Sequence, residues 1–64
     1  MESTMLTLLC SDGTIRATFI PALNALQYIE LREIVTAASK TQELSEKLAI
    51  AAVEWRVQLD VQRC

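Results

Sequence analysis

The side chains with the strongest claim to chemistry are the two thiols, Cys10 and Cys64. A cysteine becomes a nucleophile when a neighbouring base or positive charge favours the thiolate, and the chain contains no histidine. Cys10 also falls in an alternating apolar segment, where a free cysteine packs as a small hydrophobe. Because the two cysteines lack CxxC spacing, a zinc site or a disulfide framework is disfavoured. We therefore expect no catalytic thiol, no metal and no cofactor.

Two pairs of carboxylates share a helical face and could in principle divide acid and base roles. They are Glu30 with Glu33, and Glu43 with Glu46. With no histidine and no aromatic pocket beside them, solvation or compensation of a helix dipole explains them better. The chain is therefore predicted not to be an enzyme. An enzyme whose pocket forms between subunits is the least favoured of the functions considered.

Two aromatic residues are better candidates for contact with a partner. Tryptophan and tyrosine are enriched at binding hot spots, and their polar ends need a hydrogen-bond partner when buried. Trp55 belongs to a stripe that we assign to the core of the chain. Tyr28 lies near a second apolar face, so both a core and an interface position are open for it.

Length and composition predict one small domain, residues 1–64, in the cytoplasm. A chain of this size buries only about 60% of its unfolded surface, and small scaffolds commonly add disulfides, a metal or oligomerisation. The N-terminal residues lack signal-peptide features, which predicts reduced thiols. No apolar run approaches the length of about 20 residues needed to cross a membrane. The net charge of −2, with basic residues scattered, argues against nucleic-acid binding.

Residues 5–20 predict a β-hairpin, because two apolar runs flank an Asp-Gly pair. With Asp12 and Gly13 as a two-residue loop, alternation gathers six apolar residues on one face of the hairpin. These residues are Leu6, Leu8, Cys10, Ile15, Ala17 and Phe19. Residues 21–38 predict a first helix, with Pro21 in its first turn. Ser39, or alternatively Thr41, is expected to cap a second helix.

The second helix is expected over residues 41–62, with apolar residues at three- and four-residue steps on two faces. One stripe runs from Leu44 through Trp55 to Leu59 and suits the core. A rival interpretation is a strand over residues 53–62, because apolar and polar residues also alternate strictly there. No Gly, Pro or Asn marks a boundary between the two. The helix is favoured, and the strand remains the alternative.

The order hairpin, helix, helix predicts a two-layer α+β domain (ββαα) in which an antiparallel helical hairpin covers the apolar face. Both helices then carry a second apolar line that the domain itself does not bury, so we expect a homo-oligomer, with a dimer favoured, or a heterologous protein partner. The predicted interface residues are Tyr28, Leu31, Val35, Ile50, Val53, Val57 and Val61. The leading functional hypothesis is a small protein-interaction or adaptor module.

The segment from Asp12 to Pro21 resembles the strand-then-proline pattern of swapped-hairpin regulators related to AbrB and the MazE antitoxins. The resemblance covers only this short stretch, and the chain departs from such regulators because Arg16 is the only basic residue within it. It supplies an alternative function, a small dimeric DNA-binding regulator whose basic surface would combine Arg16 and Arg32. Salt-dependent binding to duplex DNA separates this alternative from the interaction module.

Overall fold

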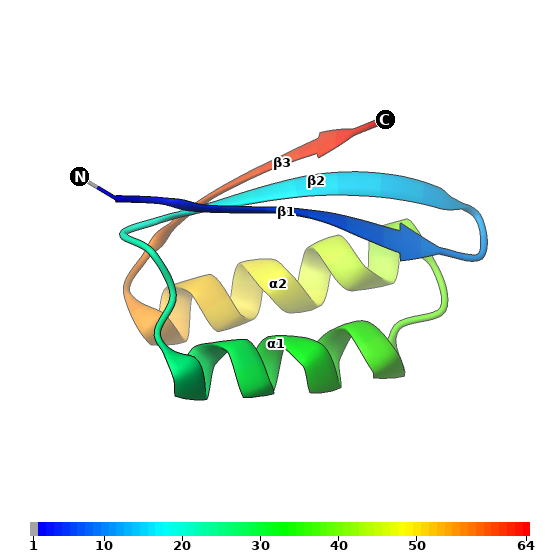
Figure 1. Cartoon of the computed structure of the whole chain (residues 1–64). Helices are drawn as coiled ribbons and strands as arrows, with labels where there is room; N and C mark the ends of the chain where they lie inside the picture. The colour runs from blue at the N-terminus through cyan, green and yellow to red at the C-terminus, as the bar shows by residue number, and fades with distance from the viewer. Residues whose placement is uncertain (1) are drawn as a thin grey trace.

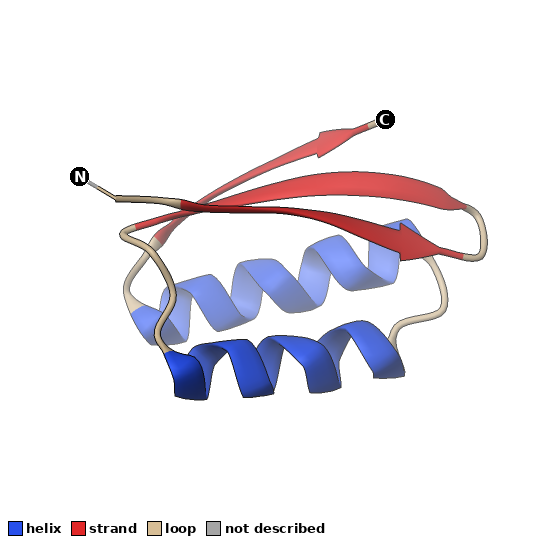
Figure 2. Cartoon of the chain, viewed as in Figure 1, coloured by secondary structure: helices blue, strands red, loops and turns tan. Residues whose placement is uncertain are grey.

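Three antiparallel strands and two helices form two layers in the computed structural model, which describes residues 2–64. The elements are β1 (Thr4–Cys10), β2 (Gly13–Ile20), α1 (Ala25–Ala37), α2 (Thr41–Trp55) and β3 (Gln58–Arg63). The strand order is β1-β2-β3, and both helices lie on one side of the sheet (Figures 1 and 2). The predicted α+β class, the hairpin and the two helices are confirmed. The ββαα order was incomplete, because it lacked the third strand.

The hairpin has the predicted faces but a different register. Cys10 pairs with Gly13 and Leu8 with Ile15, so the loop is Ser11 and Asp12 instead of Asp12 and Gly13. A shift of two residues keeps every side chain on its face, and the predicted apolar face is therefore still the inner one. Gly13 adopts a φ of +151°, a region that side-chain-bearing residues rarely enter, which explains glycine at this point.

The observed loop allows Asp12 to cap the second helix. The backbone N–H of Thr41 donates to Asp12 Oδ1 at 2.9 Å, and the Thr41 hydroxyl donates to Asp12 Oδ2 at 3.3 Å. The N-cap residue itself, Lys40, has no side-chain cap. Nearby, the Ser11 hydroxyl donates to the carbonyl of Ser39 at 2.6 Å. The expectation that Ser39 or Thr41 would cap α2 is wrong, because a residue 29 positions earlier does so.

Replacing Asp12 by asparagine should lower the unfolding midpoint at pH 7. The hydrogen bond from the Thr41 N–H, first among several causes, holds the pKa of Asp12 below its ordinary value. The unfolded carboxyl titrates near pH 3.9, so its stabilisation is present above that pH and is lost as the pH falls through the lower folded pKa. The difference between parent and variant should therefore shrink below about pH 4.

Urea unfolding at a series of pH values, followed by circular dichroism, measures this effect. Asp60→Asn is the matched control, because Asp60 is an exposed carboxylate on β3. Equal midpoints for the parent and Asp12→Asn at pH 7 would show that the negative charge of the Asp12 cap contributes nothing, since asparagine keeps a cap acceptor.

The first helix begins four residues later than predicted, at Ala25 and not at Pro21. Asn24 and Gln27 form a capping box: the side chain of each accepts a hydrogen bond from the backbone N–H of the other, both at 2.9 Å. This reciprocal cap satisfies two of the free N–H groups of a helix start. The preceding segment is tied to β1, because Leu23 N–H donates to Thr4 Oγ1 at 3.0 Å. The helix therefore starts at the cap, and Pro21 belongs to the linker.

The predicted helix over residues 41–62 is wrong beyond Trp55. Arg56 adopts the left-handed conformation with φ 57° and ψ 42°, and the N–H of Val57 bonds back to the carbonyl of Ala52. This is a helix C-terminus of the kind usually built with glycine. The chain then returns as β3, which pairs antiparallel with β2 and brings Leu59 opposite Phe19. Within residues 53–62, the strand alternative therefore holds from Gln58 onward.

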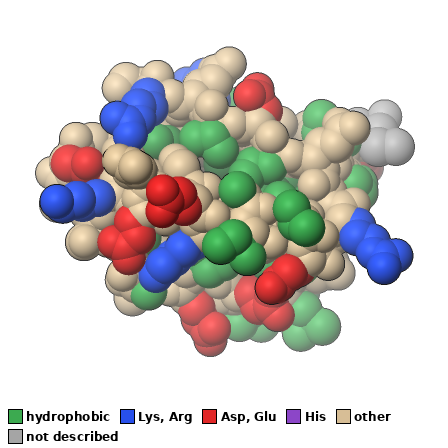
Figure 3. All heavy atoms as spheres, turned by 180° about the vertical axis from the view of Figure 1, so that it is seen from behind, with side chains coloured by type: hydrophobic (Ala, Val, Ile, Leu, Met, Phe, Trp, Pro, Cys, Tyr) green, Lys and Arg blue, Asp and Glu red, His purple; other side chains and the backbone are tan. Residues whose placement is uncertain are grey.

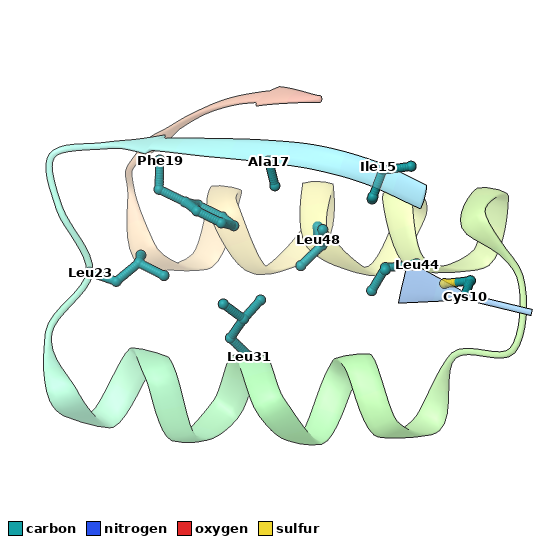
Figure 4. Close-up of a cluster of buried hydrophobic side chains, with 8 residues drawn as sticks. All are labelled: Cys10, Ile15, Ala17, Phe19, Leu23, Leu31, Leu44 and Leu48. Carbon is teal, nitrogen blue, oxygen red and sulfur yellow. The ribbon is translucent and has the colours of Figure 1, made fainter. Parts of the chain in front are cut away.

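The core lies between the sheet and the helices. Its central residues come from β2 and α2, with Phe19, Ile15, Leu44 and Leu48 fully buried (Figure 4). The rings of Phe19 and Trp55 lie 6.2 Å apart at 56°, a tilted arrangement favoured by aromatic quadrupoles. Trp55 Nε1 also donates to Glu30 Oε2 at 3.0 Å, which joins α2 to α1. The core stripe predicted around Trp55 is thus used within the chain.

Candidate functional site

An apolar groove lies between the inner side of β1 and the neighbouring face of α1. It has a volume of about 230 Å³ and is open to solvent. The residues that line it are Leu6, Leu8, Tyr28, Leu31, Arg32, Val35 and Thr36. We call it the edge groove. Three of the seven predicted interface residues, Tyr28, Leu31 and Val35, meet in it.

The edge groove exists because α1 is placed beside α2 more than against the sheet. Within residues 2–64, α2 packs closely against β2 and β3, whereas the close neighbour of α1 is α2. The helical layer therefore covers the inner face of β2 and β3 and leaves the inner face of β1 partly open. Leu6 and Leu8 remain only half-buried, although they belong to the apolar face of the hairpin.

The side chains that line the groove differ in their exposure to solvent. Leu31 is 3% exposed and points toward the sheet among the core side chains (Figure 4). Tyr28 is 38% exposed, and Val35 is half-buried. Arg32 and Thr36 are exposed and supply polar groups at the groove. Leu31 therefore forms the floor of the groove, and Tyr28 is the most exposed apolar side chain in its lining.

Beside the groove, β1 forms an open edge of the sheet, since the strand order places it at one side. Met5 and Leu9 point to the outer face of this strand and are 63% and 76% exposed. An uncovered strand edge presents free N–H and C=O groups that can pair with another strand. Edge and groove together offer backbone hydrogen bonds and apolar contacts at one place.

No protein-family model, curated protein or solved structure matches the chain. No helix within residues 2–64 combines the length and the apolar character needed to cross a membrane. Over the same residues, no three His, Cys, Asp or Glu side chains come together as a metal site would need.

The other four predicted interface residues separate into two groups. Val57 and Val61 are half-buried and pack against the intrachain core, because the chain turns at Arg56 and returns as β3, where Val61 lies opposite the buried Ala17. Ile50 and Val53 are 62% and 77% exposed on α2. From the side opposite to Figure 1, apolar side chains are seen interleaved with acidic and basic ones (Figure 3).

Several residues considered above for catalysis make contacts within the chain. Cys10 is buried in the hydrophobic cluster, and Cys64 is exposed. Glu43 forms an ion pair with Lys47 at 3.3 Å, and the hydrogen bond from this ammonium lowers the pKa of the Glu43 carboxyl. Glu30 accepts the indole hydrogen bond of Trp55. Glu30 and Glu43 therefore each have an observed partner within the chain.

The two arginines of the DNA-binding alternative lie on opposite sides of the sheet. Arg16 points outward from β2, between the inward-facing Ile15 and Ala17. Arg32 lines the edge groove on the helix side. One chain therefore does not combine them into a single basic surface.

The β1 residues of this site were not predicted from the sequence. Leu6 and Leu8 were assigned to the core face, and Met5, Thr7 and Leu9 to a partly polar outer face. One signal was available: β1 reads TMLTLLC, seven residues without a charge, a proline or a glycine. Edge strands usually carry such residues as protection against unwanted pairing.

Proposed function

We propose that this chain is a small, cytoplasmic, non-enzymatic protein-interaction module that acts as a homo-oligomer through the β1 edge and the edge groove. The observation that carries the proposal is the coincidence of an open, uncharged strand edge with an apolar groove beside it. The groove volume of about 230 Å³ lies below the roughly 300–1,000 Å³ typical of small-molecule pockets. Its lining suits aliphatic side chains of a protein better than a metabolite.

The size of the chain supports the same proposal. A domain of 64 residues has a small core, and natural proteins of this size often gain stability by association. Both cysteines are free, so no disulfide within the described residues supplies that stability. Association that covers the groove would bury Tyr28 and the half-buried Leu6 and Leu8.

The mass in solution tests the proposal. Light scattering on a size-exclusion column, in reducing buffer and over roughly a hundredfold dilution, should give a multiple of 7.2 kDa at high concentration. The mass should fall toward that of one chain on dilution, as mass action requires. A well-folded monomer at every concentration would contradict the homo-oligomer.

A pair of variants should distinguish the groove from the exposed face of α2. Tyr28→Asp removes the aromatic side chain from the edge groove and places a carboxylate there, and burying that charge is costly even though Arg32 lines the same groove. It should shift the dissociation midpoint to at least tenfold higher protein concentration, a change of about 1.4 kcal/mol. Val53→Asp adds the same charge at a position that is 77% exposed and should leave the midpoint unchanged.

Light scattering over the same dilution series measures both variants, and circular dichroism verifies that each is folded. The opposite result, with Val53→Asp dissociating the oligomer and Tyr28→Asp having no effect, would move the interface to α2.

A further inference from the structure

The hydrogen-bonding groups at the open edge of β1 can be assigned from the ladder. The carbonyl of Thr14 accepts from the N–H of Cys64, so the backbone of Thr14 faces β3. Thr14 lies opposite Leu9, and an antiparallel ladder alternates bonded and non-bonded pairs. The pair of Leu9 and Thr14 is therefore a non-bonded one, and the N–H and C=O of Leu9 point away from β2. The same alternation leaves the backbone groups of Met5 and Thr7 free at the edge.

The two edges of the sheet are not equally protected. β3 is the shorter edge strand and carries Asp60 and Arg63, charges of the kind that discourage pairing with another chain. β1 carries none in its seven residues. An unpaired, uncharged edge strand of this length can pair with another chain. The difference between the two edges indicates that β1 is the edge that a partner strand covers.

We propose that β1 pairs antiparallel with β1 of a second copy of this chain, about a twofold axis at Thr7. The two three-stranded sheets then become one sheet of six strands. This inference rests on the proposed function and specifies its partner and its register. The twofold axis makes the contact isologous, so the same surface of each copy is used and the assembly closes as a dimer.

The residue pattern of β1 is self-complementary in this register. Thr7 lies opposite Thr7 of the second copy, and Met5 lies opposite Leu9 of the second copy. Threonine pairs and apolar pairs are both favourable across strands. These are also the three residues whose backbone groups are free, so each pair is a hydrogen-bonded one. A twofold axis at any other residue of β1 leaves Met5 or Leu9 without a partner inside the strand.

The same pairing accounts for the edge groove. In a strand added beside β1, Leu6 and Leu8 of the second copy point to the helix side, because residues alternate between faces. They come to lie over Tyr28 and Val35, where the groove is open. A standard stable interface removes about 800 Å² from each partner, and the whole chain exposes 4428 Å². The strand edge supplies part of that area, and the groove supplies apolar surface beside it.

Two charge variants at Thr7 test the pairing. Thr7 is exposed, and its backbone is not bonded to β2, so Thr7→Lys and Thr7→Glu should both fold as single chains. Like charges directly opposite each other oppose strand pairing. Each variant alone should have half the mass of the parental dimer. An equimolar mixture should recover the dimer mass, because lysine then lies opposite glutamate.

The matched controls are Gln62→Lys and Gln62→Glu, which add the same charges at an exposed position on β3, on the same face of the sheet. Both should keep the parental mass. If the Thr7 variants stay dimeric, the pairing of β1 is wrong while self-association stands. If the parental chain is a folded monomer throughout, the proposed function fails as well, so the two failures are distinguishable.

A cross-link supplies an independent measurement that does not depend on the charge variants. In a Cys64→Ser background, Thr7→Cys should form a disulfide-linked dimer under mild oxidation, since Cys10 is buried. Residues in a bonded antiparallel pair have Cα atoms about 5.5 Å apart, within the roughly 4.4–6.8 Å that a disulfide spans. Gln62→Cys in the same background should not cross-link at that rate. Equal rates for the two variants would overturn the proposed register.

Discussion

Replacing Phe19 by alanine is expected to leave most of the protein molecules unfolded at 25 °C. Phe19 is fully buried, and it contacts Trp55 where α2 meets β2. Removing a buried phenylalanine side chain typically costs about 3–5 kcal/mol, through lost transfer energy and the cavity left behind. A single core in a domain of this size rarely supplies more than about 3–5 kcal/mol of net stability. The loss is therefore comparable to the whole stability.

Urea unfolding followed by far-ultraviolet circular dichroism measures the effect. This signal is preferable to tryptophan fluorescence, since Trp55 loses its aromatic neighbour in the variant. Val53→Ala is the control, because Val53 is 77% exposed and such substitutions change stability by at most about 0.5 kcal/mol. Similar midpoints for the two variants would mean that Phe19 is not at the centre of the core.

The second large effect is expected for Leu31→Ala, which should lower the free energy of unfolding by about 2–5 kcal/mol. Leu31 was predicted to be an interface residue, yet it is 3% exposed and lies among core side chains. A core residue stabilises the single chain, whereas a pure interface residue stabilises only the oligomer. The stability loss should therefore persist at every protein concentration.

Unfolding curves over a hundredfold range of concentration separate the two roles. Glu33→Ala, an exposed substitution on α1 outside the groove lining, serves as the control. A Leu31→Ala protein with parental stability at low concentration and a reduced mass at high concentration would return Leu31 to the interface.

The hairpin shows what alternation in the sequence can predict. The inner face was correct because the period of two is insensitive to a register shift of two residues. The loop was placed wrongly, because the Asp-Gly pair is a local turn signal and the observed register depends on a distant contact. Asp12 in the observed loop bonds to Thr41, 29 residues later. Local turn chemistry cannot contain that information.

The third strand was difficult to predict for a related reason. Residues 53–62 fit both a helical and a strand period, so the outcome depends on where the helix ends. It ends at Arg56, whose left-handed conformation is usually adopted by glycine, and the sequence carries no glycine there. Pairing of Leu59 with Phe19 along β2 favours the strand, and this contact is remote in sequence. Tertiary contacts here decide between two periods that fit equally well.

The candidate site was partly visible in the sequence. Tyr28, Leu31 and Val35 were grouped correctly on one helical face, and the structure brings them together in the edge groove. Their neighbours Leu6 and Leu8 could not be assigned, because sequence alone does not say which strand the helices leave uncovered. Val57 and Val61 were placed on a helical line, whereas the helix ends at Trp55 and both side chains pack against the core.

The central position of β2 has a consequence for synthesis of the chain. Phe19 is made 40 residues before Leu59, its partner in β3. At about 5–20 residues per second, the hairpin waits roughly 2–8 s before its second neighbour exists. Ile15, Ala17 and Phe19 lack a complete α2 until Trp55 is made and lack β3 for the whole interval, so the hairpin has two open edges. Productive folding therefore has to follow the appearance of the last strand, and early pairing of hairpins from different nascent chains competes with it.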